Sequence, residues 1–150
     1  CTVCLKSDIM CSGCGKKLES GEISRTEVDV SRALFRLGID VDFSRSFPAD
    51  NYIYVLASKK QTGLMIGRSG RNAKRLSIMM GKDVRVIENS SDERQLIERV
   101  IGVQVLGINK VYGDKETYKV RVERKFRYKL DGFSPVVAKI ISKNVQFVFE

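Results

Sequence analysis

The spacing of apolar residues after residue 20 predicts a helix followed by two strands. A capping-box pattern over 24–27 and apolar residues at helical spacing over 30–37 predict the helix, and Gly38 is suited to end it. Apolar and acidic residues alternate over 39–43, which predicts a half-buried strand. The continuous apolar run over 52–57 predicts a second strand that completes a hairpin with the first.

The next stretch predicts two helices joined by a glycine loop. A second capping box, over 58–61, begins a short apolar helix that runs into Gly67-Arg-Ser-Gly70. A basic helix follows the loop and stops at Gly81, and residues 84–86 form a third strand. Glycine reaches backbone conformations barred to other residues and lets a phosphodiester approach the main chain closely. The helix that begins at the loop offers unpaired N–H groups to such an anion.

The order of elements repeats later in the chain. A shift of 66 positions, from 24 to 90, carries the first capping box onto Ser90-x-x-Glu93 and predicts a helix there. A hairpin over 105–112 and 118–124 follows. Ser134 is expected to cap a helix that runs to residue 141, and a strand over 145–149 closes the chain.

The second copy keeps the position of the glycine loop but not its residues. The same shift places Gly67 beside Phe133, where the chain reads Asp131-Gly-Phe-Ser-Pro135, with an acid at its start and no second glycine. The sequence therefore predicts an α+β protein with two similar domains, 21–89 and 90–150, each ordered α-β-β-α-α-β. Only the first is expected to hold a working loop.

Composition and charge indicate a polyanionic partner for this fold. The chain has 150 residues, of which 43% are hydrophobic and 30% charged, and its net charge is +9. Between residues 59 and 85, eight basic residues face one acid, so the positive charge is concentrated around the glycine loop. Charge that is clustered in this way favours nucleic acid as the partner.

Other classes of function have little support in the sequence. The chain contains no histidine, which removes His-based nucleophilic and acid–base catalysis, and it shows no P-loop. We therefore expect no enzymatic activity and no small-molecule substrate. No apolar run approaches the ~18 residues of a membrane span and no signal-peptide pattern opens the chain. We expect a cytoplasmic protein without a membrane partner.

All four cysteines lie in two C-x-x-C pairs within the first segment. Cys1 and Cys4 form one pair, and Cys11 and Cys14 the other. Thiolates at this spacing suit a closed tetrahedral Zn²⁺ site, and the segment 1–20 has too few apolar residues to fold by burial. We predict a zinc knuckle or ribbon with one structural Zn²⁺ per chain. Iron in place of zinc and two disulfides are the alternatives, and a reducing cytosol disfavours the disulfides.

The loop Ile66-Gly-Arg-Ser-Gly-Arg-Asn72 and its flanking elements resemble the KH domain, whose glycine loop clamps about four nucleotides of RNA. The element order is similar to that of the type II, prokaryotic form. Two such domains in tandem resemble the paired KH module of the transcription elongation and antitermination factor NusA, particularly its short archaeal form. The resemblance spans 24–150 and implies that RNA emerging from RNA polymerase binds at Gly67, Arg68, Ser69 and Gly70, in transcription elongation or termination.

The residues of the first domain themselves indicate an RNA site. Six basic side chains are expected to neutralise the RNA backbone: Lys59, Lys60, Arg68, Arg71, Lys74 and Arg75. Residues 64–66, which are Leu64, Met65 and Ile66, are expected to face the bases together with the second strand. A second basic cluster over 121–129 surrounds Phe126 and Tyr128, whose rings we assign to the core or the domain interface. Stacking of bases on these rings is the alternative.

Two host assemblies suit such a protein. In the first, it binds nascent single-stranded RNA at RNA polymerase. In the second, it docks on rRNA of the ribosomal small subunit through its KH and zinc modules, and the zinc segment contacts protein or RNA. Dependence on free single-stranded RNA would favour the first host, and co-sedimentation with ribosomes the second.

Overall fold

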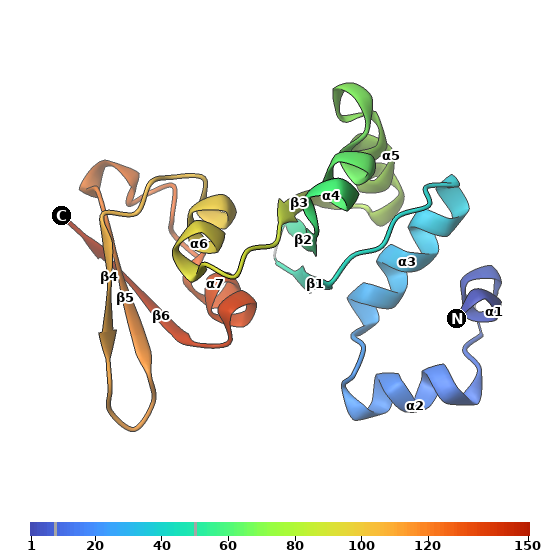
Figure 1. The fold of residues 1–150 in the computed structure, drawn as a ribbon, viewed down its shortest axis with the longest axis horizontal. Coiled ribbons are helices and arrows are strands. Elements are labelled where there is room, and N and C mark those ends of the chain that lie inside the picture. The colour runs from blue at the N-terminus through green and yellow to red at the C-terminus, as the bar shows by residue number, and fades with distance from the viewer. Residues whose placement is uncertain (8, 50) are drawn as a thin grey trace. The chain divides into compact units, whose positions relative to one another are not determined.

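A computed structural model describes residues 1–7, 9–49 and 51–150, and the chain divides into two compact units, 1–87 and 88–150 (Figure 1). Each unit contains its own three-stranded sheet together with helices, so the predicted α+β class is confirmed. Among the described residues, we find no helix whose length and apolar character would let it cross a bilayer.

Unit 1 opens with two short helices that carry the cysteines. α1 is Thr2–Lys6 and α2 is Ser12–Ser20, and each begins directly after the first cysteine of a C-x-x-C pair. The Sγ atom of Cys11 caps α2 by accepting the backbone N–H of Cys14. The predicted ribbon is therefore wrong in its local structure: within residues 1–7 and 9–20 the chain is helical and contains no strand.

The remaining helices of unit 1 build its core. α3, Arg25–Leu37, is capped by Ser24, which accepts the N–H of Glu27 at 3.1 Å, and it ends at a left-handed Gly38, as the sequence predicts. α4, Lys59–Ile66, leads through a 3₁₀ turn, Arg68–Gly70, into α5, Arg71–Met80. The core cluster joins these helices to the sheet and includes Val30, Leu34, Val55, Met65 and Leu76. Burial of each such side chain stabilises the fold by about 1.5–3 kcal/mol.

The sheet of unit 1 has the strand order β1-β2-β3. β1 is Arg45–Pro48, β2 is Tyr52–Ala57 and β3 is Asp83–Glu88, and β1 pairs antiparallel with β2. The second strand has the predicted bounds, and the third extends beyond the predicted 84–86 at both ends.

The first predicted strand, over 39–43, is wrong, because β1 begins only at Arg45. The apolar side chains at 39, 41 and 43 do pack against the core cluster. The backbone N–H of Asp42, however, donates to Oε1 of Gln61 at 3.1 Å, a side chain instead of a neighbouring strand. Alternation of apolar and acidic residues thus indicates that one side of the segment is buried. It does not by itself indicate that the backbone of the segment pairs in a sheet.

Unit 2 repeats the sheet with a new set of residues. α6, Glu93–Ile101, precedes β4, Gly107–Val111, and β5, Thr117–Val122. A 3₁₀ turn, Arg124–Phe126, is followed by α7, Ser134–Ile141, and β6, Asn144–Phe149. The order is β4-β5-β6, with β4 antiparallel to β5 and β5 parallel to β6. Tyr118, Val120 and Val122 of β5 are buried, in agreement with the predicted alternation.

The predicted α-β-β-α-α-β order is wrong for unit 2, where the described residues between β5 and α7 form only the 3₁₀ turn and further turns. Residues 124–129 are dominated by charged side chains, with Phe126 as the half-buried apolar residue and Leu130 buried behind it. Such a stretch has no apolar stripe with which an α-helix could pack.

Both predicted helix caps in unit 2 are also wrong. Asp92 caps α6 in place of Ser90, because its carboxylate accepts the N–H of Arg94 at 3.0 Å. Ser134 does not cap α7 but lies inside it, and its hydroxyl donates to the carbonyl of Val145 at 2.5 Å. In both cases the serine hydroxyl does not bind the backbone N–H of the first helical turn that the sequence pattern predicts as its partner.

Candidate metal centre and candidate nucleic-acid interface

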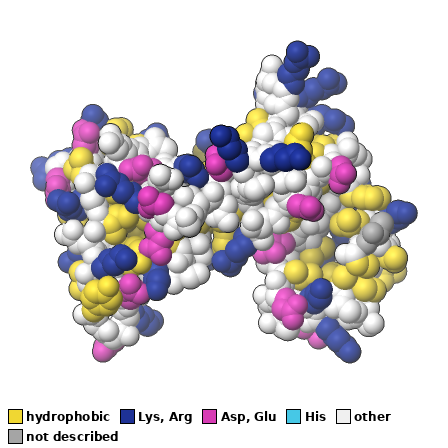
Figure 2. Space-filling model, in the orientation of Figure 1, with side chains coloured by type: hydrophobic (Ala, Val, Ile, Leu, Met, Phe, Trp, Pro, Cys, Tyr) yellow, Lys and Arg dark blue, Asp and Glu magenta, His cyan; other side chains and the backbone are white. Residues whose placement is uncertain are grey.

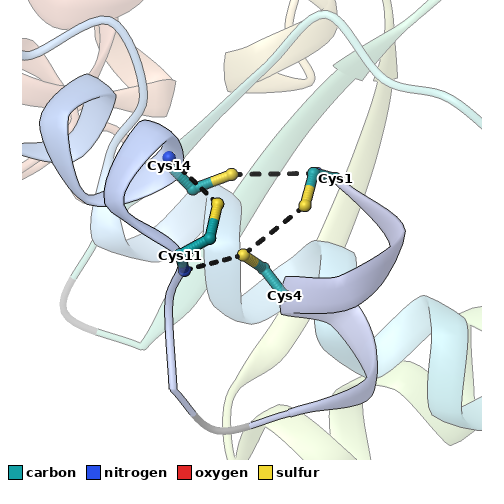
Figure 3. A group of neighbouring side chains, drawn as sticks. All are labelled: Cys1, Cys4, Cys11 and Cys14. Atoms are coloured by element: carbon teal, nitrogen blue, oxygen red, sulfur yellow. Dashed lines mark hydrogen bonds between the residues drawn. The ribbon is translucent and has the colours of Figure 1, made fainter.

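The four cysteine side chains come together in one cluster (Figure 3). Their Sγ atoms all lie within 4.8 Å of one another, and those of Cys1 and Cys4 are 3.6 Å apart. All four are free thiols. Tetrahedral Zn²⁺ with Zn–S bonds of about 2.3 Å needs sulfur atoms about 3.8 Å apart. The cluster therefore has the ligand type, number and size that suit one metal ion.

Backbone N–H groups donate hydrogen bonds to two sulfur atoms of this cluster. The N–H of Cys14 donates to Sγ of Cys11 at 3.4 Å, and the N–H of Cys11 donates to Sγ of Cys4 at 3.2 Å. The bond from Cys14, helped by the Cys4 thiol, lowers the pKa of Cys11 to about 7. The N–H of Cys11 also lowers the pKa of Cys4, but burial and the neighbouring thiols outweigh it and raise that pKa. Cys11 thus offers a thiolate, the form that binds a metal, near neutral pH.

Arg32 attaches the cysteine cluster to α3. Its side chain is buried, and Nε donates to the carbonyl oxygen of Cys4 at 3.1 Å. Its Nη2 atom is also buried, and no residue in the described part of the chain accepts a hydrogen bond from it. The sequence analysis missed Arg32. The available signal is that Val28, Arg32 and Phe35 fall at helical spacing on a second face of α3, apart from the stripe that enters the core.

The glycine loop has a backbone that requires its glycines. Gly67 lies at φ 74° and ψ 178°, a region that is essentially reserved for glycine, and Gly70 lies at φ 73°. Ser69 between them is left-handed at φ 55°. A Cβ added to Gly67 would lie 2.7 Å from Nδ2 of Asn72, whose amide also donates to the carbonyl of Leu64 at 3.1 Å. Asn72 therefore holds the end of α4 beside the start of α5 and leaves no space for a side chain at Gly67.

The predicted basic residues lie on α4, the glycine loop and α5, and all are exposed. Figure 2 shows Lys and Arg side chains gathered over the end of unit 1 where α4 and α5 meet. Within residues 1–7, 9–49 and 51–150, no carboxylate forms an ion pair with any of Lys59, Lys60, Arg68, Arg71, Lys74 and Arg75, and all six are exposed. Their charges are therefore available to an anionic ligand.

The predicted apolar surface for bases needs correction. Met65 is fully buried in the core of unit 1, so it does not face a ligand. Leu64 and Ile66 are exposed as predicted, at 49% and 36%. The predicted contribution of the second strand is also wrong, because β2 is buried from Ile53 to Ala57. Ile78 on α5 is 83% exposed, and the sequence analysis did not name it.

The equivalent stretch of unit 2 keeps one left-handed glycine but not the arrangement around it. Gly132 is left-handed at φ 82°, but Leu130 before it is buried and α7 begins after Phe133. Two of the basic residues nearby are already paired: Arg121 with Glu150 at 3.7 Å and Lys125 with Glu123 at 2.8 Å.

The two rings of the second basic cluster do not share one environment. Phe126 is half-buried and lies under the ammonium group of Lys125, 5.1 Å from the ring centre. Tyr128 is 93% exposed, so its assignment to the core is wrong. Four of the other residues of the stretch 124–129 are basic, and only Phe126 is apolar.

Comparisons with known proteins establish similarity of fold. No family model matches this chain, and no curated protein does. Among solved structures, the chain is similar to one described as the crystal structure of APE1850, with a TM-score of 0.63 and 22% sequence identity. The match covers 78% of this chain and 93% of that chain. At this identity the similarity concerns the fold alone, because one fold can serve many functions.

Proposed function

We propose that this chain is an RNA-binding protein that clamps single-stranded RNA at the glycine loop of unit 1. The observation that carries the proposal is the combination at residues 67–70: a backbone that only glycine allows at Gly67, and exposed side chains at Arg68 and Ser69. The exposed basic side chains of α4, the loop and α5 form no ion pair with a described carboxylate. Such a loop lets a phosphodiester approach the main chain, and the start of α5 presents its positive end to the same place.

The residues around the loop have separate roles in this proposal. The six basic side chains named above hold the phosphates and give affinity and register. Leu64, Ile66 and Ile78 provide the exposed apolar surface against which bases lie. Sequence preference is expected to be modest, because few polar groups that read base edges lie on this surface.

We propose further that the two units are tandem type II KH domains. Two observations support this. Unit 1 has the order helix, two strands, helix, turn, helix, strand. Unit 2 repeats this order with a 3₁₀ turn in place of one helix, and its sheet pairs two antiparallel strands followed by a parallel one. In this proposal only unit 1 has a loop that clamps RNA.

The cellular role that fits best is that of a NusA-like transcription elongation or termination factor in the cytoplasm, with no catalytic activity. Docking on the ribosomal small subunit is the other candidate, and both use the same RNA surface. A pull-down of the tagged protein from its native cell distinguishes them: RNA polymerase among the captured proteins supports the first, and ribosomes without polymerase support the second.

We propose that Cys1, Cys4, Cys11 and Cys14 hold one structural Zn²⁺. Four thiols leave no open position for a substrate, so the ion would supply folding energy to α1 and α2. The chain itself contributes the N–H groups that hold the sulfur atoms and the bond from Arg32 to Cys4. Metal analysis of freshly reduced protein tests this, and protein without metal would refute it.

The RNA proposal is tested by Arg68→Asp with Ser69→Asp. Both residues are exposed, so the fold should persist, while two anions would lie where a phosphate must bind. We expect loss of most of the affinity for a single-stranded RNA, measured by fluorescence anisotropy. Lys16→Asp with Ser91→Asp is the control, because it makes the same change of charge at exposed positions outside the loop. Equal affinities of the two well-folded variants would move the RNA site elsewhere.

A further inference from the structure

Unit 1 contains a second candidate binding surface that does not include the glycine loop. A cavity of about 750 Å³ lies between the cysteine segment, α3 and the segment 39–44 that follows it. Its apolar lining includes Leu5, Ile23, Val28, Phe35 and Val41. Four of these side chains are half-buried, and Phe35 is 41% exposed. The apolar walls of the cavity are therefore accessible to a ligand.

The charge of this cavity is opposite to that of the glycine loop. Four carboxylates line it, those of Glu22, Glu27, Asp40 and Asp42, in a chain whose net charge is +9. None of the four forms an ion pair with a residue in the described part of the chain. Figure 2 shows hydrophobic side chains gathered on this side of unit 1 with acidic ones near them. A polyanion such as RNA would be repelled here, whereas a cationic partner would be attracted.

Arg32 helps to form the wall of this cavity. It lines the cavity, its side chain is only 6% exposed, and its Nε donates to the carbonyl oxygen of Cys4 at 3.1 Å. This bond ties the cysteine segment to α3, so the two walls that these elements form are held together.

We propose that this cavity, which we call the acidic groove, binds a segment of a partner protein in which aliphatic and basic side chains alternate. The apolar walls accept the aliphatic side chains, and the four carboxylates pair with lysine or arginine. Unit 1 then binds RNA at the glycine loop and protein at the acidic groove, with opposite charges keeping the two ligands on their own surfaces.

Occupation of the groove depends on the cysteine cluster. Cys1, Cys4 and Cys14 form part of its lining, and α1 packs against α3 through the bond from Arg32 to Cys4. Loss of order in residues 1–20 would therefore remove one wall. Binding of the partner segment is expected to require the intact cluster, whereas binding of RNA at the glycine loop is not.

The test uses a fluorescent synthetic peptide of alternating leucine and lysine, added to the reduced, metal-loaded full chain. Glu22→Lys with Asp42→Lys should weaken its binding by about tenfold or more, because two attractive contacts become repulsive. Glu19→Lys with Asp83→Lys is the matched control, since it adds the same charge at exposed acids that do not line the groove. The control should stay within about twofold of the unmodified chain, by the size of exposed charge effects. RNA affinity of both variants should be retained.

Two further probes complete the test. A peptide of alternating leucine and glutamate, and one of alternating serine and lysine, should both bind at least about tenfold more weakly than the first, since each lacks one of the two required contacts. Equal weakening by the groove and control variants would overturn the proposal, because it would show general charge attraction. Failure of the leucine–lysine peptide to bind would also overturn it. The proposal would fail too if Glu22→Lys with Asp42→Lys, but not the control variant, altered the binding of single-stranded RNA.

Discussion

The glycine loop of unit 1 and the equivalent stretch of unit 2 occupy the same place in the order of elements but differ in what they offer a ligand. In unit 1 the loop joins two α-helices, and Asn72 of the second helix fills the space beside Gly67. In unit 2 the chain arrives from turns, and Phe133 lies where Gly67 would be. Unit 2 keeps one left-handed glycine, Gly132, and a helix after the stretch, but residues 131–135 hold no second glycine and the described residues directly before them form turns instead of an α-helix. We therefore expect a loop of this kind to bind RNA only in unit 1, where both glycines and both helices are present.

The largest effect on this comparison is expected from Gly67→Ala. The new Cβ would meet the Asn72 side chain at 2.7–3.0 Å, in a backbone region that disfavours alanine. The strain is about 1–3 kcal/mol, so the loop should change shape and RNA affinity should fall by about tenfold or more. Gly132→Ala is the matched control, because that glycine is also left-handed but nothing lies within 4 Å of its added Cβ. It should lose stability, by thermal unfolding, and keep its RNA affinity.

An intermediate effect is expected from Asn72→Ala. This change removes the bond from the Asn72 amide to the carbonyl of Leu64 and opens space beside Gly67. A hydrogen bond of this kind contributes about 0.5–1.5 kcal/mol, so RNA affinity should fall severalfold with little change of fold. Anisotropy titration measures the affinity. An RNA affinity equal to that of the unmodified chain would mean that the loop keeps its shape without this contact.

A smaller effect is expected on the salt dependence of RNA affinity, and it should differ between the basic residues of the two units. Lys74→Ala with Arg75→Ala should reduce the slope of log affinity against log salt by about 0.7 for each lost contact with single-stranded RNA. Arg121→Ala with Lys125→Ala should change the slope less, because both residues are paired with glutamates. Titrations at several salt concentrations give the two slopes. Equal changes in slope would make unit 2 an equal partner in RNA binding.

The smallest effect on RNA binding is expected from removal of the metal. Chelation should abolish the helical structure of residues 1–20. Without bonds from the thiolates to a metal, α1 and α2 keep few buried contacts to hold them. The core cluster around Met65 and Leu76 contains no residue of this segment, so the glycine loop should keep its shape. Circular dichroism and anisotropy measure the two outcomes. Unfolding of the whole of unit 1 would contradict the independence of the two sites.

Local patterns in the sequence predicted much of unit 1 because its residues are used locally. Ser24 and Ser58 cap the helices that follow them, and Gly38 and Gly81 end helices in left-handed conformations. The four cysteines were predicted to share one site, and the structure brings them together because C-x-x-C spacing places each pair on one turn of helix. These features depend on interactions over a few residues, which the sequence shows directly.

The predictions that failed depend on partners distant in the sequence. Residues 39–43 alternate like a strand, but Gln61 binds their backbone in place of a neighbouring strand. Met65 lies beside exposed residues in the sequence, yet tertiary packing buries it. Arg32 gained its role from a carbonyl 28 positions earlier in the chain. No local pattern carries this information, because each contact forms only when separate elements pack.

The most direct test of the central claim is to follow backbone amide signals by NMR while single-stranded RNA is added to the intact chain. If RNA is clamped in unit 1 alone, the amides of residues 67–72 should show the largest shifts, and those of 131–136 should show little change. The added RNA should also leave the amides that line the acidic groove unshifted, because that surface repels anions. Large shifts at 131–136 with none at 67–72 would contradict this account.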